Sequence, residues 1–371
     1  MNITVIGAGS WGIALASLLN TNGHNVKMWS KNIEEVETIN KKHSIDRYLP
    51  GFSIPEEIVV YSDMGKSLED AEIVIMAVPS IAVRECSKMV SKYKKECIVV
   101  DVAKGIEEAT LKRLSEVIEE EMPFAKVVTL SGPSHAEEVV KMNPTAVTVA
   151  SKDVKTRNLV ADVFRNEYFR VYPNEDIIGV EIGGALKNII AVCAGIVDGL
   201  DLGDNAKAGL ITRGLAEITR LAVKMGANTE TLFGLAGLGD LVVTCGSKHS
   251  RNYRAGLLIG QGNDLETTLN KINMVVEGVN TTRAGKKLGE KYEVELPIIE
   301  KANEIIFGGK DPRAAVLELM TRKGKEEYIV DEKWFCDNWD ISVFVVSMMQ
   351  RKRSVPKLLQ NYVVSVLLFF K

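Results

Sequence analysis

The chain has 371 residues, of which 46% are hydrophobic and 26% charged, so it is too long for one small domain and suited to a globular core. A formal net charge of −3 gives no electrostatic reason to expect nucleic acid or an anionic membrane as a partner. The five cysteines are scattered, without a CxxC pair or nearby histidines, which favours free thiols over disulfides or a metal site. No signal-peptide pattern opens the chain and no apolar run reaches the ~18 residues of a membrane span. We therefore expect a cytoplasmic protein without a transmembrane segment.

Short β-rich runs alternate with helical patterns through the first half of the chain. This alternation is typical of a mostly parallel, doubly wound sheet with helices on both faces. The predicted strands cover residues 3–6, 26–29, 58–60, 73–78, 98–102, 127–130 and 146–150, and the helices between them cover residues 13–20, 33–41, 81–92 and 110–121.

Long amphipathic stretches replace the strand signals after about residue 178. We therefore expect an α/β domain of the Rossmann type over residues 1–178, followed by an all-helical domain over residues 179–330. Because no Pro-, Gly- or Ser-rich linker separates them, the two domains should pack tightly. The predicted helices of the second domain cover residues 184–200, 207–225, 251–259, 281–288, 298–307 and 311–320.

The last segment, residues 331–371, does not continue the pattern of amphipathic helices. It holds Trp334 and Trp339, a basic run at residues 351–353, and apolar runs too short to cross a bilayer. It fits an extra docking element, a surface-binding helix or a stretch never selected for this fold, and these alternatives stay open.

A GxGxxG pattern, Gly7-Ala8-Gly9-Ser10-Trp11-Gly12, follows the first predicted strand and opens a helix. In dinucleotide-binding folds the first glycine permits the tight turn, the second admits the pyrophosphate, and the third allows close packing of helix on strand. The helix N-terminus then presents free N–H groups to the phosphates. The pattern predicts a dinucleotide site, whereas a merely tight turn is the alternative.

The choice between NADH and NADPH stays open in the sequence. An NAD-specific site usually has an acid about 20 residues beyond the glycines, at the end of the second strand. Here that strand is followed by Ser30 and Lys31, which cannot repel a 2′-phosphate. Lys31 could attract one, or it could be a solvated surface lysine, so the sequence fits both NADPH and NADH.

Lys187 interrupts an otherwise apolar, glycine-rich helical stretch at residues 181–191. An ammonium in such a place must be either paired or chemically used, because burial removes its water. The alternative is a lysine that packs its stem along the core and brings its head to the surface.

Four further segments carry polar residues that a core does not need. Lys104 follows a buried strand, so it should emerge at the carboxyl edge of the sheet, where open α/β sheets bind ligands. Residues 131–136 resemble a loop with exposed N–H groups, and residues 237–244 a glycine-rich turn that carries Asp240. Ser250 is a good N-cap, and an arginine and an amide behind it at a helix start are a natural phosphate receptor.

With these residues the chain resembles the NAD(P)-dependent glycerol-3-phosphate dehydrogenases. The resemblance runs from Met1 to about Lys325 and implies a Rossmann-type domain followed by a helical domain of the 6-phosphogluconate dehydrogenase C-terminal type. The matching segments are residues 7–12, 102–105, 131–137, 183–188, 237–244, 250–252 and 276–278, with 319–322 near the family's usual end.

The resemblance implies a role for each matching residue. Lys187 would donate and accept the proton, with Lys104 and Asp240 as its catalytic neighbours. The substrate site would comprise Lys104, Gly132, Ser134, Lys187, Asn188, Asp240, Thr244, Ser250, Arg251 and Asn252; the cofactor site would comprise Gly7, Gly9, Ser10, Trp11, Gly12, Lys31, Lys104, Ala136, Arg251, Val275 and Glu277.

The implied reaction is reversible hydride transfer between NADH or NADPH and dihydroxyacetone phosphate, which gives sn-glycerol 3-phosphate for phospholipid synthesis. Burial and the cation of Lys104 should lower the pKa of Lys187 from ~10.4 toward neutrality, whereas Asp240 should oppose that shift. A related hydroxyacid dehydrogenase and a non-catalytic dinucleotide sensor are the rival interpretations. A homodimer is the default assembly for such a fold.

Overall fold

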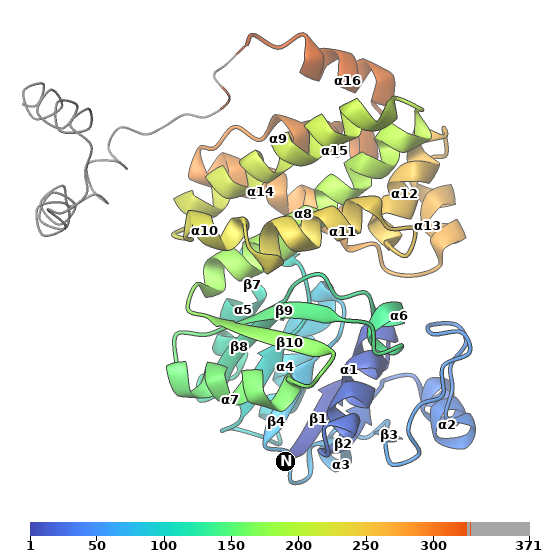
Figure 1. Cartoon of the computed structure of the whole chain (residues 1–371), viewed down its shortest axis with the longest axis vertical. Coiled ribbons are helices and arrows are strands. Elements are labelled where there is room, and N and C mark those ends of the chain that lie inside the picture. Colours follow the sequence, from blue (N-terminus) through green and yellow to red (C-terminus); the bar gives the residue numbers. More distant parts are fainter. Residues whose placement is uncertain (325–326, 328–371) are drawn as a thin grey trace, which may run out of the picture. The chain divides into compact units, whose positions relative to one another are not determined.

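The structure is a computed structural model that describes residues 1–324 and residue 327. The predicted atypical segment, residues 331–371, lies outside the described residues. Residues Met1–Met320 form one compact unit, and Thr321–Lys371 are a separate unit. In the first unit a sheet with its helices is followed by a region built from helices alone (Figure 1).

The sheet has eight strands in the order β10-β9-β8-β5-β4-β1-β2-β3. Neighbouring strands are parallel except for the antiparallel pair β8 and β9, so the mostly parallel sheet is confirmed. All seven predicted strands are present. The strands are β1 (Asn2–Ile6), β2 (Asn25–Trp29), β3 (Val59–Tyr61), β4 (Ile73–Met76), β5 (Ile98–Asp101), β8 (Lys126–Ser131), β9 (Thr145–Ala150) and β10 (Phe169–Asn174).

Both faces of this sheet are covered. Along β4, Ile73 and Ile75 join one apolar cluster, whereas Val74 and Met76 join another on the opposite face. Such near-continuous apolar runs are expected of parallel strands between two helix layers, since successive side chains point to opposite faces. The helices of this half are α1 (Ser10–Thr21), α2 (Ile33–Lys42), α3 (Met64–Leu68), α4 (Val83–Ser91), α5 (Leu114–Glu121), α6 (Ala136–Val139) and α7 (Val154–Phe164).

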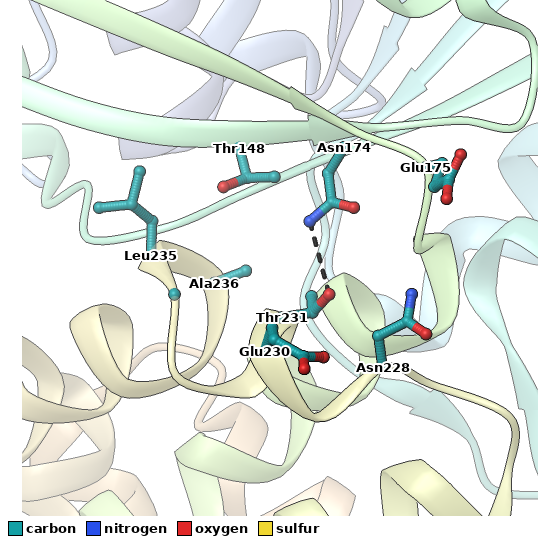
Figure 2. A pocket seen from close by; sticks show the side chains of 9 residues that line it. Thr148, Asn174, Glu175, Asn228, Glu230, Thr231, Leu235 and Ala236 are labelled. Atoms are coloured by element: carbon teal, nitrogen blue, oxygen red, sulfur yellow. Dashed lines mark hydrogen bonds between the residues drawn. The ribbon is translucent and has the colours of Figure 1, made fainter. Parts of the chain in front are cut away.

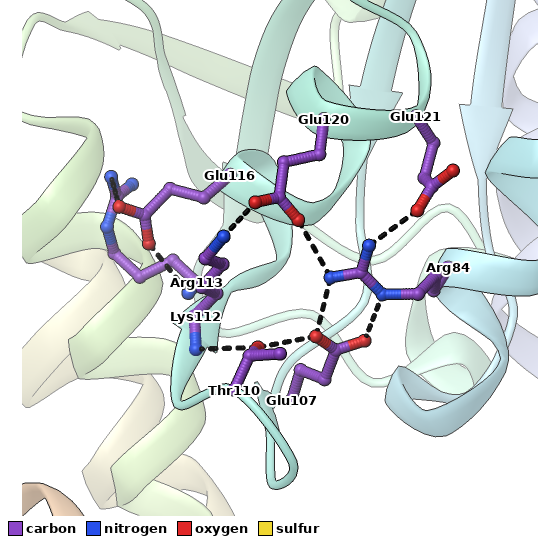
Figure 3. Close-up of polar contacts among 8 residues, drawn as sticks. All are labelled: Arg84, Glu107, Thr110, Lys112, Arg113, Glu116, Glu120 and Glu121. Carbon is purple, nitrogen blue, oxygen red and sulfur yellow. Dashed lines mark hydrogen bonds and ion pairs between the residues drawn. The ribbon is translucent and has the colours of Figure 1, made fainter.

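The helix predicted over residues 110–121 begins later than expected. A small hairpin, β6 (Ile106–Glu107) and β7 (Lys112–Arg113), precedes α5. Figure 3 shows why the hairpin is held: the Arg84 guanidinium donates to Glu107 at 2.7 Å and to Glu120 at 2.9 Å. These ion pairs join α4 and α5 to the segment that directly follows Lys104, a long-range arrangement that no local pattern reports.

The helical half surrounds α8 (Ile177–Gly199), which contacts α9, α11, α12, α14 and α15. Of the helices in the described part of the chain, α8 alone is long and apolar enough to cross a membrane, and 94% of its most apolar window is buried inside the protein. Its neighbours are α9 (Gly203–Lys224), α10 (Thr229–Leu232), α11 (Asp240–Gly246), α12 (Arg251–Gly260), α13 (Leu265–Ile272), α14 (Glu277–Tyr292), α15 (Pro297–Gly308) and α16 (Pro312–Met320).

The glycine-rich turn predicted at residues 237–244 is wrong, because this segment is helical. A π-helix, η2 (Leu235–Gly239), runs directly into α11, and the Gly239 N–H donates to the Gly234 carbonyl at 3.1 Å. A Cβ at Gly237 would lie 2.0 Å from the Leu232 carbonyl oxygen, so the close approach requires glycine. Short π-helices occur frequently at functional sites, and this one ends directly before Asp240, the first residue of α11.

Candidate active site

Lys187 lies inside the helical half and not at its surface. It sits in the middle of α8 and is only 5% exposed. Its Nζ donates to Asp240 Oδ1 at 2.9 Å and to Thr244 Oγ1 at 2.6 Å, both on α11. The alternative of a lysine that extends its head to solvent is therefore wrong. An ammonium has three N–H donors, and these contacts use two of them.

Lys104 approaches the same carboxylate from the sheet. It follows β5, and its Nζ donates to Asp240 Oδ2 at 2.6 Å and to the Gly132 carbonyl at 3.0 Å. Each oxygen of Asp240 thus holds one lysine, one from each half of the compact unit. Parallel strands end at a common edge of the sheet, which brings the segments after β5 and β8 together at this place.

Inside this cluster the pKa of Lys187 is lowered to about 8. Burial is the main cause, the positive charge of Lys104 adds to it, and the carboxylate of Asp240 opposes it. Burial alone would raise the pKa of Asp240, but the two lysines outweigh it and hold that pKa below its usual value. The predicted direction of the Lys187 shift and its predicted causes are confirmed.

Thr244 is oriented by the backbone of its own helix. Its hydroxyl donates to the Asp240 carbonyl at 2.6 Å, so a lone pair faces the Lys187 ammonium. The two partners of Lys187 therefore come from successive turns of α11 (Asp240–Gly246) and place its Nζ from two sides.

A second polar chain runs beside the lysine. Asn252 Nδ2 donates to Asn188 Oδ1 at 2.8 Å, and the Gly278 N–H donates to Asn252 Oδ1 at 2.8 Å. Ser250 caps α12 by accepting the Tyr253 N–H at 3.2 Å, as predicted. Arg251 follows the cap. Burial lowers the pKa of its guanidinium, whereas the negative charges of Glu277 and Glu137 partly offset this shift.

The glycine loop has the geometry that a dinucleotide requires. Gly7 has φ +113°, and its N–H donates to the Trp29 carbonyl at 2.8 Å, which ties the loop to the end of β2. A Cβ at Gly12 would lie 2.1 Å from the Gly7 carbonyl oxygen, whereas a Cβ at Gly9 would meet nothing within 4 Å. The loop is closed where helix meets strand and open above Gly9 and the N-terminus of α1, so these residues fit a pyrophosphate.

The remaining predicted residues lie around these two groups. Glu277 Oε1 accepts the Ser80 N–H at 2.9 Å and its Oε2 accepts the Ser80 hydroxyl at 2.6 Å, so α14 is tied to the end of the sheet. Ser134 Oγ donates to the Gly132 carbonyl at 3.0 Å, and Ala136 is buried. Ser10, Trp11 and Val275 are half-buried and Lys31 is exposed, without a contact that joins them to the lysine cluster.

Two residues of this region were not predicted from the sequence. Burial, together with the charges of Lys187 and Lys104, lowers the pKa of His135, and its Nε2 is buried without a hydrogen-bond partner. The position of His135 inside the segment 131–136 is the signal that could have identified it. Glu35 accepts hydrogen bonds from Ser30 and Tyr48, and only the folded chain brings these three together.

A surface pocket with a volume of about 300 Å³ lies elsewhere, between the ends of β9 and β10 and the segment 228–236 (Figure 2). Its lining residues include Asn174, Asn228 and Thr231 and none of the predicted site residues. Among the described residues, no group of three or more His, Cys, Asp or Glu side chains could hold a metal ion.

The family models, the sequence relatives and the solved structure described here are all glycerol-3-phosphate dehydrogenases. Residues 2–157 match the N-terminal domain, and residues 176–317 the C-terminal domain, of NAD-dependent glycerol-3-phosphate dehydrogenase. The glycerol-3-phosphate dehydrogenase [NAD(P)+] of Lysinibacillus sphaericus is 52% identical over 334 residues, which cover 89% of this chain and 98% of that protein. That of Geobacillus thermodenitrificans is also 52% identical, over 88% of this chain and 96% of that protein. The crystal structure of glycerol-3-phosphate dehydrogenase from Coxiella burnetii superposes with a TM-score of 0.84 at 39% identity, over 86% of this chain and 99% of that one.

Proposed function

The chain belongs to the NAD-dependent glycerol-3-phosphate dehydrogenase family, and from this premise we propose how its own residues carry out the reaction. The reaction is the reversible reduction of dihydroxyacetone phosphate to sn-glycerol 3-phosphate with NADH or NADPH. When bound, the dinucleotide supplies the hydride for C2 of the substrate in one direction and accepts it in the other. The contacts of Lys187 are the observation that supports the assignment of roles.

Lys187 is the proposed general acid. Asp240 and Thr244 hold two of its N–H groups, which leaves a third to donate to the carbonyl oxygen of the substrate. As C2 is reduced, negative charge develops on that oxygen, and Lys187 Nζ delivers the proton. A pKa of about 8 suits this task, because a group that titrates close to the working pH can both give and take the proton.

Asp240 and Lys104 are proposed to set the position and charge of that acid. The Asp240 carboxylate fixes both ammonium groups, at 2.9 Å from Lys187 and 2.6 Å from Lys104. Lys104 also lowers the pKa of Lys187, and it offers a second cation to the oxygen on which charge develops. The pair therefore works as an acid beside an electrostatic stabiliser.

Arg251 and Asn252 are the proposed receptor for the substrate phosphate. They open α12 behind the Ser250 cap, where the helix N-terminus and a guanidinium both favour an anion. Asn252 is fixed by Asn188 and by the Gly278 N–H, so it is preorganised before the substrate arrives. Gly132 and Ser134 would line the same pocket. The cofactor would be held by Gly7, Gly9, Ser10, Trp11, Gly12, Lys31, Lys104, Ala136, Arg251, Val275 and Glu277.

The test is Lys187→Met, assayed by the nicotinamide absorbance after protein, NADPH and dihydroxyacetone phosphate are mixed. We expect kcat to fall about 1,000-fold, as for loss of a general acid, while the dissociation constant for the dinucleotide changes by less than about threefold. Near-normal turnover in this variant would refute the assignment. Arg251→Ala provides the complementary result, an increase mainly in KM for dihydroxyacetone phosphate.

The proposal also covers the metabolic role, the compartment, the oligomeric state and the domain division of the enzyme. The product suits the supply of glycerol 3-phosphate to phospholipid synthesis. We place the enzyme in the cytoplasm because its five cysteines fit a reducing compartment, and we assign it a homodimer as the commonest symmetric assembly. The division into a dinucleotide-binding domain at 1–178, a substrate domain at 179–330 and an atypical segment at 331–371 belongs to the same proposal. Sedimentation of the full chain tests the dimer.

A further inference from the structure

A carboxylate, that of Glu35, lies at the end of β2 although it is not the residue that directly follows the strand. The Gly7 N–H donates to the Trp29 carbonyl at 2.8 Å, so the residue after β2 lies beside the glycine loop. That residue is Ser30, which is buried, and its Oγ donates to Glu35 Oε2 at 3.0 Å. The first turn of α2 thus returns an acid to the position where dinucleotide folds read the adenosine ribose.

Glu35 is held there from two sides. Its second oxygen, Oε1, accepts the Tyr48 hydroxyl at 2.7 Å. Burial and the neighbouring Glu35 raise the pKa of Tyr48 to about 12, so the phenol keeps its proton and remains a donor. Ser30 is itself fixed, because its Oγ accepts the Asn32 N–H at 3.2 Å. The carboxylate is therefore anchored and not a freely rotating surface charge.

Two cationic residues are sequence neighbours of the partners of this carboxylate, since Lys31 follows Ser30 and Arg47 precedes Tyr48. Within residues 1–324 and 327, no hydrogen bond or ion pair holds the exposed ammonium of Lys31. The Arg47 guanidinium lies 5.6 Å from the centre of the Tyr48 ring and donates to the Asn273 carbonyl at 3.4 Å. A 2′-phosphate would be attracted by these cations and repelled by Glu35, whereas a 2′-hydroxyl would find an acceptor in Glu35.

We propose that Glu35 is a specificity-determining residue, whose carboxylate favours the ribose hydroxyl of NADH and opposes the 2′-phosphate of NADPH that Lys31 attracts. This inference rests on the proposed function in so far as it takes the end of β2 as the adenosine side of the cofactor site. With these opposed charges the enzyme accepts both cofactors. Removing the charge of Glu35 should shift the ratio of the two affinities toward NADPH, and removing that of Lys31 should shift it toward NADH.

The experiment is calorimetric binding of NADH and of NADPH to the full chain, without substrate, at about 25 mM and about 300 mM salt. For Glu35→Gln we expect NADPH to bind about five- to tenfold more tightly at low salt and NADH to bind up to about threefold more weakly. Lys31→Ala should weaken NADPH about fivefold and leave NADH within about twofold. Both effects should shrink at high salt, since screening acts on a phosphate charge near the surface.

Glu34→Gln is the matched control, because it removes the same charge from an exposed position in the same helical turn. It should change neither dissociation constant by more than about twofold. The inference is overturned if Glu35→Gln weakens both cofactors equally, leaves their ratio unchanged, or acts no differently from Glu34→Gln. Failure of the unmodified protein to bind either dinucleotide would instead refute the proposed function, and this inference with it.

Discussion

Helix α8 carries two buried charges, Glu181 and Lys187, which the fold treats in different ways. Glu181 is 7% exposed and Lys187 is 5% exposed, so water stabilises neither. Glu181 accepts hydrogen bonds from the Ser115 N–H at 2.8 Å, from the Ser115 hydroxyl at 2.6 Å and from Arg113. Lys187 has two partners and a third N–H without one among the described residues.

The difference separates a charge that joins parts of the fold from one that is available for chemistry. Glu181 links α8 to the start of α5 through a carboxylate whose two oxygens are both occupied. Lys187 has one anionic partner among the described residues, Asp240, and shares it with Lys104. Burial and the charge of Lys104 keep Lys187 easier to deprotonate than an exposed lysine. Burial alone therefore does not distinguish the two charges; the unused donor and the shared counter-ion of Lys187 support its proposed catalytic role.

The largest effect on stability is expected at Glu181. Glu181→Leu leaves the guanidinium of Arg113 without its buried partner, and we expect a loss of about 3–5 kcal/mol in the free energy of unfolding. Denaturant titration measures this loss, and kcat per folded molecule should stay within about threefold. Glu116→Gln is the control, because it removes a more exposed partner of the same arginine and should cost less than about 1 kcal/mol. A fall in kcat as large as that of Lys187→Met would remove the distinction between the two charges.

Asp240→Asn is expected to change the rate of catalysis and its pH dependence. Without the carboxylate, Lys104 repels Lys187 unopposed, so the pKa of Lys187 should fall below about 8. We expect kcat for reduction at neutral pH to fall about 100-fold, and the pH at which it declines to move to lower values. Asp198→Asn provides the comparison, because that carboxylate lies on α8, the helix of Lys187, and pairs with Lys207 at 2.6 Å, away from the lysine cluster. An unchanged pH profile in Asp240→Asn would show that Asp240 does not tune the acid.

The smallest expected effect is the pH dependence of the unmodified enzyme. Reduction requires the Lys187 ammonium, so kcat should be level below the pKa of about 8 and fall about tenfold per pH unit above it. Oxidation of glycerol 3-phosphate requires the free amine and should show the opposite slope. Steady-state rates in both directions measure this, with cofactor binding followed over the same pH range. An inflection close to 10.4, about the value of an exposed lysine, would contradict the assignment.

Much of the fold follows from local sequence, and the departures have identifiable causes. Strand β10 was not predicted because Pro173 interrupts its pattern, and the sheet tolerates this proline because β10 is an edge strand. The hairpin before α5 was not predicted because the ion pairs of Arg84 hold it from outside the segment. Residues 237–244, where the π-helix runs into α11, were predicted as a turn, because glycines that signal a turn also permit a very close backbone approach.

Local patterns along the chain are enough to predict the parts of the site that depend on residue order. The glycine motif after a strand, the lysine in an apolar helix and the serine cap before Arg251 are local patterns, since each depends on turn geometry, helical burial or a cap. They were sufficient to predict the two-part fold, the family resemblance and the direction of the Lys187 pKa shift.

Which charges meet depends on how distant segments pack in the folded chain. Lys104 and Asp240 are 136 residues apart, and Lys187 and Asp240 are 53 apart, yet one carboxylate holds both lysines. Glu35 and Ser30 are close in sequence, but the return of the acid to the end of β2 depends on the entry of α2 and on Tyr48. Hydrogen bonds and ion pairs act over a few ångströms, whereas local periodicity carries no information on which distant segments come that close.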